Sequence, residues 1–329
     1  MKKIISALLA LCILLSLFAC TASSEQKSEP RLRILCTLFP QYDWLRNVTE
    51  GIDGVEVSLI IANGTDPHSY QPTAADIMSI SNCDMLVYVG GDSDTWVKKA
   101  IERSKNQNIK AVALTELEGI TLQKISAESH SHDGHSHGED HAHEHSALDE
   151  HLYLSLNNAI AATVALTKAL NELDPENSEA YWQNTADYAL KLIGLNKSFE
   201  GDLARLDAES KFILFADRFP FVYLMSDYGI HYAAAFEGCT TDVDADFDTV
   251  IRLIHEADEH NVKYITVTES GSTALASTVI SSTKSKNQEI ITLNSMQAIT
   301  KTQIENGATY LSVMEENINK VKTALGLDA

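Results

Sequence analysis

Cysteine, proline and positive charge are all scarce in this chain of 329 residues. With 5 cysteines and 6 prolines, the chain fits neither a disulfide-stapled scaffold nor a fibrous protein. The 25 lysines and arginines are outnumbered by 46 aspartates and glutamates, which gives a formal net charge of −21. Nucleic-acid phosphates and anionic lipid surfaces repel such a chain, so nucleic acid is excluded as the partner.

The common sequence signatures of enzymes are also missing. The chain contains no HExxH, GxSxG, Walker or GxGxxG pattern, so a hydrolase, ATPase or dinucleotide enzyme has no motif to support it. Apolar residues make up 44% of the sequence, which is enough for one large core or two lobes of ordinary size. These absences favour a binding protein over an enzyme.

The first 20 residues have the pattern of a secretory signal. Two lysines precede an apolar run that is too short for a membrane span and that polar sequence follows at once. The run ends in LFAC, which resembles the lipobox of bacterial lipoproteins, where Cys20 would carry the lipid. We expect a signal peptide with lipobox at 1–20, a tether at 21–30 and a protein outside the cytoplasm, attached to the bacterial membrane only through this lipid. A signal cut elsewhere and an uncleaved anchor are the alternatives.

The rest of the chain alternates between short runs rich in Val and Ile and helical patterns. This alternation is typical of parallel sheets covered by helices, so we predict an α/β fold of two lobes with mainly parallel sheets. The predicted strands cover 31–39, 55–62, 84–91 and 109–115 in the first lobe and 211–216, 230–236, 262–268 and 289–294 in the second.

One long helix is predicted between the lobes. Asp174, Pro175 and Glu176 are typical of a helix N-terminus, with an N-cap, a first-turn proline and a favourable acid. The amphipathic pattern then continues to about residue 206, a rod of roughly 45 Å at the α-helical rise. We therefore expect the first lobe at 31–173, the linking helix at 174–209 and the second lobe at 210–329.

A histidine-rich segment at 130–145 is the densest chemical signal in the chain. Imidazole nitrogens suit zinc, copper and nickel, and interleaved acids add oxygen donors and negative potential. The segment holds no apolar residue larger than alanine, so we interpret it as a metal-collecting loop within the first lobe. Its histidines are His130, His132, His135, His137, His141, His143 and His145. A solvated linker that binds metals only adventitiously is the alternative.

Two further histidines lie where the chain should hold them in place. His68, in GTDPHSYQPTAADI, directly follows a predicted strand, and Pro67 stiffens the approach to it. His151, in LDEHLYLSLNNA, lies between the histidine-rich segment and a predicted helix. Ligands of open α/β sheets collect beyond the carboxyl ends of the strands, and His68 meets that rule.

These motifs, in this order, resemble the zinc and manganese receptor family of ABC transporters, the metal-binding solute-binding lipoproteins related to ZnuA, AdcA and PsaA. The resemblance covers residues 31–329. It implies a rigid linking helix, a divalent metal in the cleft between the lobes and delivery of that metal to permease subunits in the membrane. His68 and His151 match the family's first two histidine ligands, and Asp66 matches an acid beside the site.

The second lobe departs from the family's ligand pattern. Aligned on Tyr223, the third position, usually His for zinc and Glu for manganese, holds Arg218, which cannot bind a cation. The fourth position, usually Asp, holds Asn294, whose amide oxygen is a weak ligand. Three alternatives remain: Asp217 or Glu269 substitutes, water or the histidine-rich segment completes the two histidines, or Arg218 pairs with Glu269 and closes the cleft without metal.

We therefore expect a monomeric receptor without bond-making chemistry that binds Zn²⁺, or else Mn²⁺, for an ABC permease. A manganese receptor, a surface adhesin with structural metal and, last, a zinc hydrolase with Glu269 as base are the alternatives. Cys36, Cys83 and Cys239 all lie in apolar surroundings, and we expect them to be small buried residues rather than ligands.

The sequence predicts that Cys20 is the first residue of the mature chain and carries a lipid. Mass spectrometry of protein extracted from the membrane should show the lipid on that residue. An unmodified N-terminus downstream of Cys20 would contradict this prediction.

Overall fold

The computed structural model describes residues 30–124, 148–237 and 245–327. The chain divides into two compact units, Met1–Arg31 and Leu32–Ala329, and nearly all of the first lies outside the described residues. Cys20, the histidine-rich segment at 130–145 and Cys239 also lie outside them. The fold below is that of the second unit.

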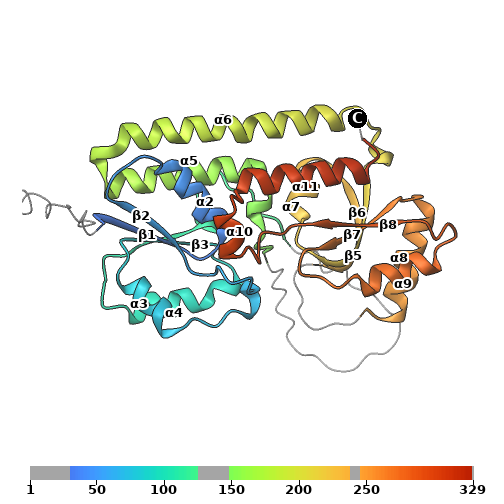
Figure 1. Ribbon diagram of the computed structural model, residues 1–329, viewed down its shortest axis with the longest axis horizontal. Helices are drawn as coiled ribbons and strands as arrows, with labels where there is room; N and C mark the ends of the chain where they lie inside the picture. Colours follow the sequence, from blue (N-terminus) through green and yellow to red (C-terminus); the bar gives the residue numbers. More distant parts are fainter. Residues whose placement is uncertain (1–29, 125–147, 238–244, 328–329) are drawn as a thin grey trace, which may run out of the picture. The chain divides into compact units, whose positions relative to one another are not determined.

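The described residues of the second unit form two four-stranded sheets, and all strand pairings within these sheets are parallel. The first sheet has the order β2-β1-β3-β4 and the second β6-β5-β7-β8 (Figure 1). The strands are β1 Leu32–Cys36, β2 Val55–Leu59, β3 Met85–Tyr88, β4 Lys110–Ala113, β5 Phe212–Phe219, β6 His231–Glu237, β7 Tyr264–Thr268 and β8 Glu289–Leu293. Each lies within or overlaps a predicted strand, and the predicted fold class is confirmed.

Helices cover both faces of each sheet. The α-helices are α2 Phe39–Val48, α3 Ala74–Ser81, α4 Thr95–Arg103, α5 Leu156–Leu173, α6 Ser178–Leu203, α7 Val222–Asp227, α8 Phe247–Glu259, α9 Thr273–Ser282, α10 Lys301–Glu305 and α11 Tyr310–Ala324. The 3₁₀ helices are η1 Pro67–Ser69, η2 Asp92–Asp94, η3 Leu114–Glu116, η4 Leu152–Leu154, η5 Pro175–Asn177 and η6 Ala208–Ser210. Within the described ranges, no helix is both long and apolar enough to cross a bilayer.

The buried apolar residues that the structure describes form three clusters, and successive residues of a strand face different clusters. On β1, Ile34 faces a large cluster with α2 and α5, whereas Leu35 faces a smaller one with α3 and α4. On β5, Phe215 faces the large cluster and Leu214 faces a third one with α8 and α9. The large cluster thus contains core residues of both lobes, which share one continuous interior.

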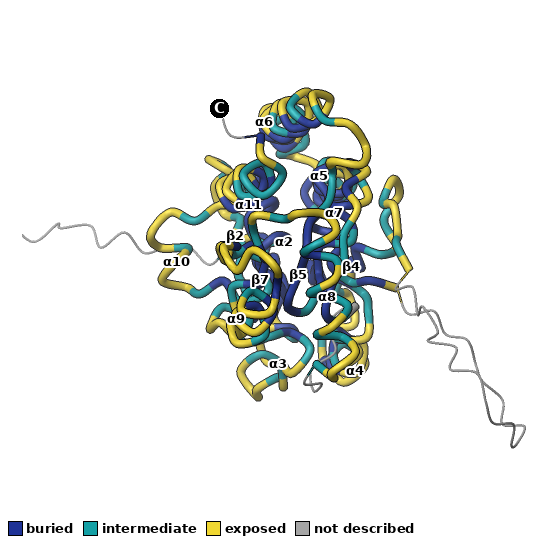
Figure 2. Tube along the Cα trace, turned by 90° about the vertical axis from the view of Figure 1, so that its right-hand side faces the viewer, coloured by how far each residue is buried: buried dark blue, intermediate teal, exposed yellow. Residues whose placement is uncertain are grey.

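Helix α6 packs against that shared interior. Its 26 residues make a rod of about 39 Å. In Figures 1 and 2 it lies beside α5 and α11, with its buried side toward them. The buried positions recur at three- and four-residue intervals, as one face of an amphipathic helix should: Tyr181, Thr185, Tyr188, Leu192, Asn196, Phe199 and Leu203.

The beginning of α6 differs from the prediction in one respect. Asp174 makes no side-chain N-cap hydrogen bond; the residue ends α5, and η5 precedes α6. Its Oδ2 instead accepts hydrogen bonds from the Tyr181 hydroxyl at 2.7 Å and the Asn177 amide at 2.8 Å. The Asp174 carboxylate therefore joins the turn before α6 to the first buried tyrosine of that helix.

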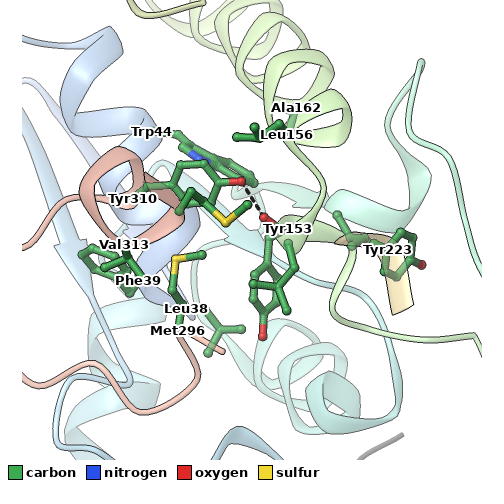
Figure 3. Close-up of a cluster of buried hydrophobic side chains, with 14 of the residues drawn as sticks. Leu38, Phe39, Trp44, Tyr153, Leu156, Ala162, Tyr223, Met296, Tyr310 and Val313 are labelled. Atoms are coloured by element: carbon green, nitrogen blue, oxygen red, sulfur yellow. Dashed lines mark hydrogen bonds between the residues drawn. The ribbon is translucent and has the colours of Figure 1, made fainter. Parts of the chain in front are cut away.

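The C-terminal helix α11 completes the interior of the first lobe. The Tyr310 hydroxyl donates to the Tyr153 carbonyl at 2.7 Å, and its ring packs edge-on against Trp44 with the centroids 5.2 Å apart (Figure 3). The Tyr310 backbone N–H donates to Asp43 Oδ2 at 3.0 Å. Burial raises the pKa of Asp43 to about 6, because water no longer stabilises its charge.

The pKa of Asp43 has a consequence for stability. A raised folded-state pKa means that the folded chain holds this proton between about pH 4 and pH 6 while the unfolded chain releases it. The free energy of unfolding contributed by this residue therefore falls as pH rises through that window, by about 3 kcal/mol. In Asp43→Asn this fall should disappear, because the amide oxygen keeps the bond to Tyr310 without a charge. Chemical denaturation from pH 4 to 7 measures it.

The exposed acid Asp53 is the matched control for this measurement. Asp53→Asn should leave the pH dependence of the wild-type chain in place. If Asp43→Asn retained the whole dependence too, the buried carboxyl would not be its source.

Candidate metal centre

His68 lies at the carboxyl end of the first sheet, on the short helix η1 that follows β2. Asp66 is its N-cap residue, and Asp66 Oδ1 accepts from the His68 backbone N–H at 2.9 Å. Pro67 at the first helical position fixes the approach. The Asp-Pro-His sequence thus sets the direction of the histidine locally.

His151 is held more tightly, with only 2% of the residue exposed. Asp149 Oδ1 lies 2.9 Å from His151 Nδ1 and also accepts from its backbone N–H at 2.8 Å. The Tyr223 hydroxyl, from the second lobe, donates to the Asp149 carbonyl at 2.7 Å. A carboxylate at Nδ1 keeps the proton on that nitrogen, so the Nε2 lone pair is available to a ligand.

The two histidines point at the same atom. Gln297, which follows β8 in the second lobe, has its Nε2 at 2.9 Å from His151 Nε2 and 3.1 Å from His68 Nε2. The imidazole centroids are 5.8 Å apart. The structure therefore brings His68 and His151 together, as predicted, and adds a residue that the sequence analysis did not name.

Backbone contacts between the lobes flank this point. The Lys301 N–H donates to the Ala62 carbonyl at 2.8 Å, and Asn63 forms an isolated antiparallel bridge with Thr300. The loops that carry His68 and Gln297 are thus joined directly. The distance between these two loops is therefore set by backbone hydrogen bonds as well as by side-chain packing.

Arg218, which the resemblance assigns to the third ligand position, forms an ion pair between the lobes. Its Nη1 lies 3.0 Å from Asp66 Oδ2, with about a quarter of each side chain exposed. The alternative that Arg218 pairs with Glu269 is therefore wrong, because the guanidinium reaches across to the first lobe instead. Asp66 thus positions His68 through one oxygen and binds Arg218 through the other.

Asp217 is turned away from the histidines and is bound within its own lobe. Its Oδ2 accepts from the Thr268 hydroxyl at 2.6 Å and from its N–H at 2.9 Å. It also lies against Gly271, where a Cβ would be 1.6 Å from Oδ2, so only glycine fits there. Asp217 is committed to holding β5, β7 and the following turn together.

Glu269 and Asn294 are likewise engaged away from the histidines. Glu269 accepts from the Ser295 N–H at 2.8 Å and from the Ser295 hydroxyl at 2.7 Å. Asn294 Oδ1 accepts from the Met296 N–H at 2.8 Å, which makes a tight side-chain turn. Neither is brought together with the two histidines in the structure.

Within residues 30–124, 148–237 and 245–327, no group of three or more His, Cys, Asp or Glu side chains is arranged to hold a metal ion. The described part of the site thus offers two imidazoles and one amide, all neutral donors. Cys36 and Cys83 are buried and free, and burial raises the pKa of both thiols, that of Cys83 to about 12. Such thiols are poor metal ligands at neutral pH.

A family model described as zinc-uptake complex component A, periplasmic (ZnuA), matches residues 34–324. The chain belongs to the ZnuA family. The resemblance inferred from the two histidine motifs is thereby confirmed. In this ZnuA-family chain both histidines lie within the residues that the family model matches.

Curated relatives match almost the whole length of this chain. The high-affinity zinc uptake system protein ZnuA of Bacillus subtilis is 31% identical over 326 residues, 96% of each chain. The zinc-binding lipoprotein AdcA of Streptococcus pneumoniae is 30% identical over 323 residues, 98% of this chain. The match spans 61% of the length of AdcA, so that relative has a further part that this chain does not match.

Solved structures have the same fold. The Zn(II)-bound ZnuA-like domain of Streptococcus pneumoniae AdcA gives a TM-score of 0.68 at 26% identity, over 89% of this chain and 98% of that domain. The metal-dependent lipoprotein YcdH of Bacillus subtilis gives 0.71 at 25% identity, over 89% of this chain and 99% of that one.

Arg218→His should tighten zinc binding by at least about tenfold, or about 1.4 kcal/mol. The substitution removes a fixed positive charge, releases the Asp66 carboxylate and places an imidazole at the family's third ligand position. Competition with a chromogenic chelator measures the affinity.

Arg218→Gln separates the two causes, because it removes the charge without supplying an imidazole. We expect it to gain less than Arg218→His. Equal affinity of Arg218→His and the wild-type chain would contradict the assignment of this position to the site.

Proposed function

We propose that this protein is the extracytoplasmic zinc receptor of an ABC importer, which captures Zn²⁺ and delivers it to permease subunits in the membrane. The observation that carries the proposal is that His68 and His151 direct their Nε2 atoms at one point, where the second lobe meets them with Gln297. Imidazole nitrogens are common zinc ligands, and water can fill positions of a four-coordinate zinc site that the protein leaves open.

The donor set supports zinc rather than manganese. Manganese favours carboxylate and other oxygen ligands, and the described acids beside the histidines are engaged elsewhere. Asp66 binds Arg218, and Asp149 orients His151 from behind the ring. We assign His68 and His151 as the fixed zinc ligands, with Asp66 and Arg218 beside them.

The relatives' names support the transport role and the lipid anchor. One is called a high-affinity zinc uptake protein and another a zinc-binding lipoprotein. We propose accordingly that Cys20 carries the lipid and that the histidine-rich segment at 130–145 raises the local concentration of zinc near the fixed site.

A hydrolase is disfavoured by the position of its candidate base. Both carboxylate oxygens of Glu269 accept hydrogen bonds from Ser295, so neither is directed at the histidines. A general base must reach the proton that it removes. Receptor activity requires only binding and release.

His68→Ala and His151→Ala should each lower zinc affinity by at least about tenfold, equivalent to about 1.4 kcal/mol. Each removes one of the two imidazoles that converge on the site. Chelator competition measures the affinity, and a chain without residues 130–145 removes the background from the histidine-rich segment.

His231→Ala is the matched control, because His231 is an exposed histidine at the start of β6. It should bind zinc as the wild-type chain does. If both site variants also retained wild-type affinity, the histidines would not form the zinc site.

A further inference from the structure

Gln297 takes the place that a cation would have between the two imidazoles. Its Nε2 lies 2.9 Å from His151 Nε2 and 3.1 Å from His68 Nε2. An amide nitrogen carries two hydrogens, which is one for each ring. The lone pairs that would bind zinc are thus the acceptors of these two hydrogen bonds.

The hydrogen bonds at the other end of the amide favour the opposite orientation. Gln297 Oε1 lies 3.2 Å from Ser295 Oγ, and that hydroxyl lies 2.7 Å from Glu269 Oε1. A hydroxyl has one proton, and an ionised carboxylate can only accept, so the proton belongs to the shorter contact. The side of Ser295 Oγ that faces Gln297 then carries a lone pair. An amide N–H can donate a hydrogen bond to this lone pair, whereas the amide oxygen cannot.

A half-turn of the Gln297 amide group exchanges the positions of Oε1 and Nε2 and leaves the shape of the side chain almost unchanged. Nε2 would then donate to Ser295 Oγ, and Oε1 would face the two imidazoles. Asp149 keeps the proton of His151 on Nδ1, so an amide oxygen facing the His151 Nε2 lone pair is repelled unless a cation lies between them. The side chain therefore has one favourable orientation without a cation and another with it.

The backbone before Gln297 holds it in place. Met296 has φ of +60°, a left-handed conformation that a bulky side chain rarely adopts. Its side chain is fully buried in the cluster with Leu38 and Phe39 (Figure 3), and its N–H is bound by Asn294. Such disfavoured backbone persists only where packing imposes it and is concentrated at functional sites.

We propose that Gln297 is the third protein ligand of the zinc ion, through Oε1, and that its amide turns when zinc enters. This inference rests on the proposed function, since it assumes that zinc binds His68 and His151. It assigns the second lobe's contribution to a residue three positions beyond Asn294.

Gln297→Glu and Gln297→Leu test the proposal in the full chain, since the histidine-rich segment is common to all variants. Glu offers oxygens in both orientations and adds a negative charge, so zinc affinity should rise at least tenfold. Leu keeps the size of the side chain but offers no ligand, so affinity should fall at least fivefold. Chelator competition measures both, and thermal unfolding checks that each variant is folded.

Gln107→Glu is the control for the change of charge. Gln107 is exposed between α4 and β4, at the opposite edge of the first sheet from His68, and this variant should bind zinc as the wild-type chain does. If Gln297→Leu bound zinc as well as the wild type or more tightly, the amide would be only a competitor of zinc and not a ligand. Affinity of Gln297→Glu no higher than that of Gln107→Glu would also overturn the proposal.

The histidine variants separate this inference from the function on which it rests. Loss of zinc in His68→Ala and His151→Ala, with no loss in Gln297→Leu, would overturn only the role of Gln297. Wild-type affinity in both histidine variants would overturn the zinc site itself.

Discussion

The arrangement of the site depends on the apolar interior that the two lobes share. Ile34 of the first sheet and Phe215 of the second belong to one buried cluster, which α5, α6 and α11 cover. Moving one lobe away from the other would expose part of that cluster, at roughly 25 cal/mol for each Å² of apolar surface. The proposed zinc site is therefore preformed, and the adjustments on binding are expected in side chains more than in lobe positions.

Charge balance distinguishes this site from one built with carboxylates. The protein's own cation, Arg218, already neutralises Asp66, and the converging donors at His68, His151 and Gln297 are neutral. An incoming zinc ion would keep most of its double charge, so each donor holds it less strongly than a carboxylate would. Such moderate binding would suit the proposed role, in which the protein must release zinc again.

The strands and the long helix were predictable because their signals are local. Apolar runs and helical spacing depend on neighbouring residues, and the motifs around His68 and His151 lie in continuous segments. The position of Gln297 between the histidines was not predictable, since it follows from the turn that Asn294 makes with Met296 and from the left-handed backbone of Met296. The ion pair of Arg218 with Asp66 was not among the alternatives for a similar reason. Contacts between lobes depend on how the whole interior packs.

The position of α11 determines when the protein can fold. Tyr310, near the end of the chain, fills the space beside Trp44 and bonds to Asp43 and Tyr153, all more than 150 residues earlier. The first lobe cannot complete its interior until almost the entire polypeptide is available. Folding is then a late event with long loops to close, which slows it. Late folding would suit a chain that crosses a membrane in the unfolded state. Its N-terminal half would remain incompletely folded until α11 is available, so little structure would have to unfold before export.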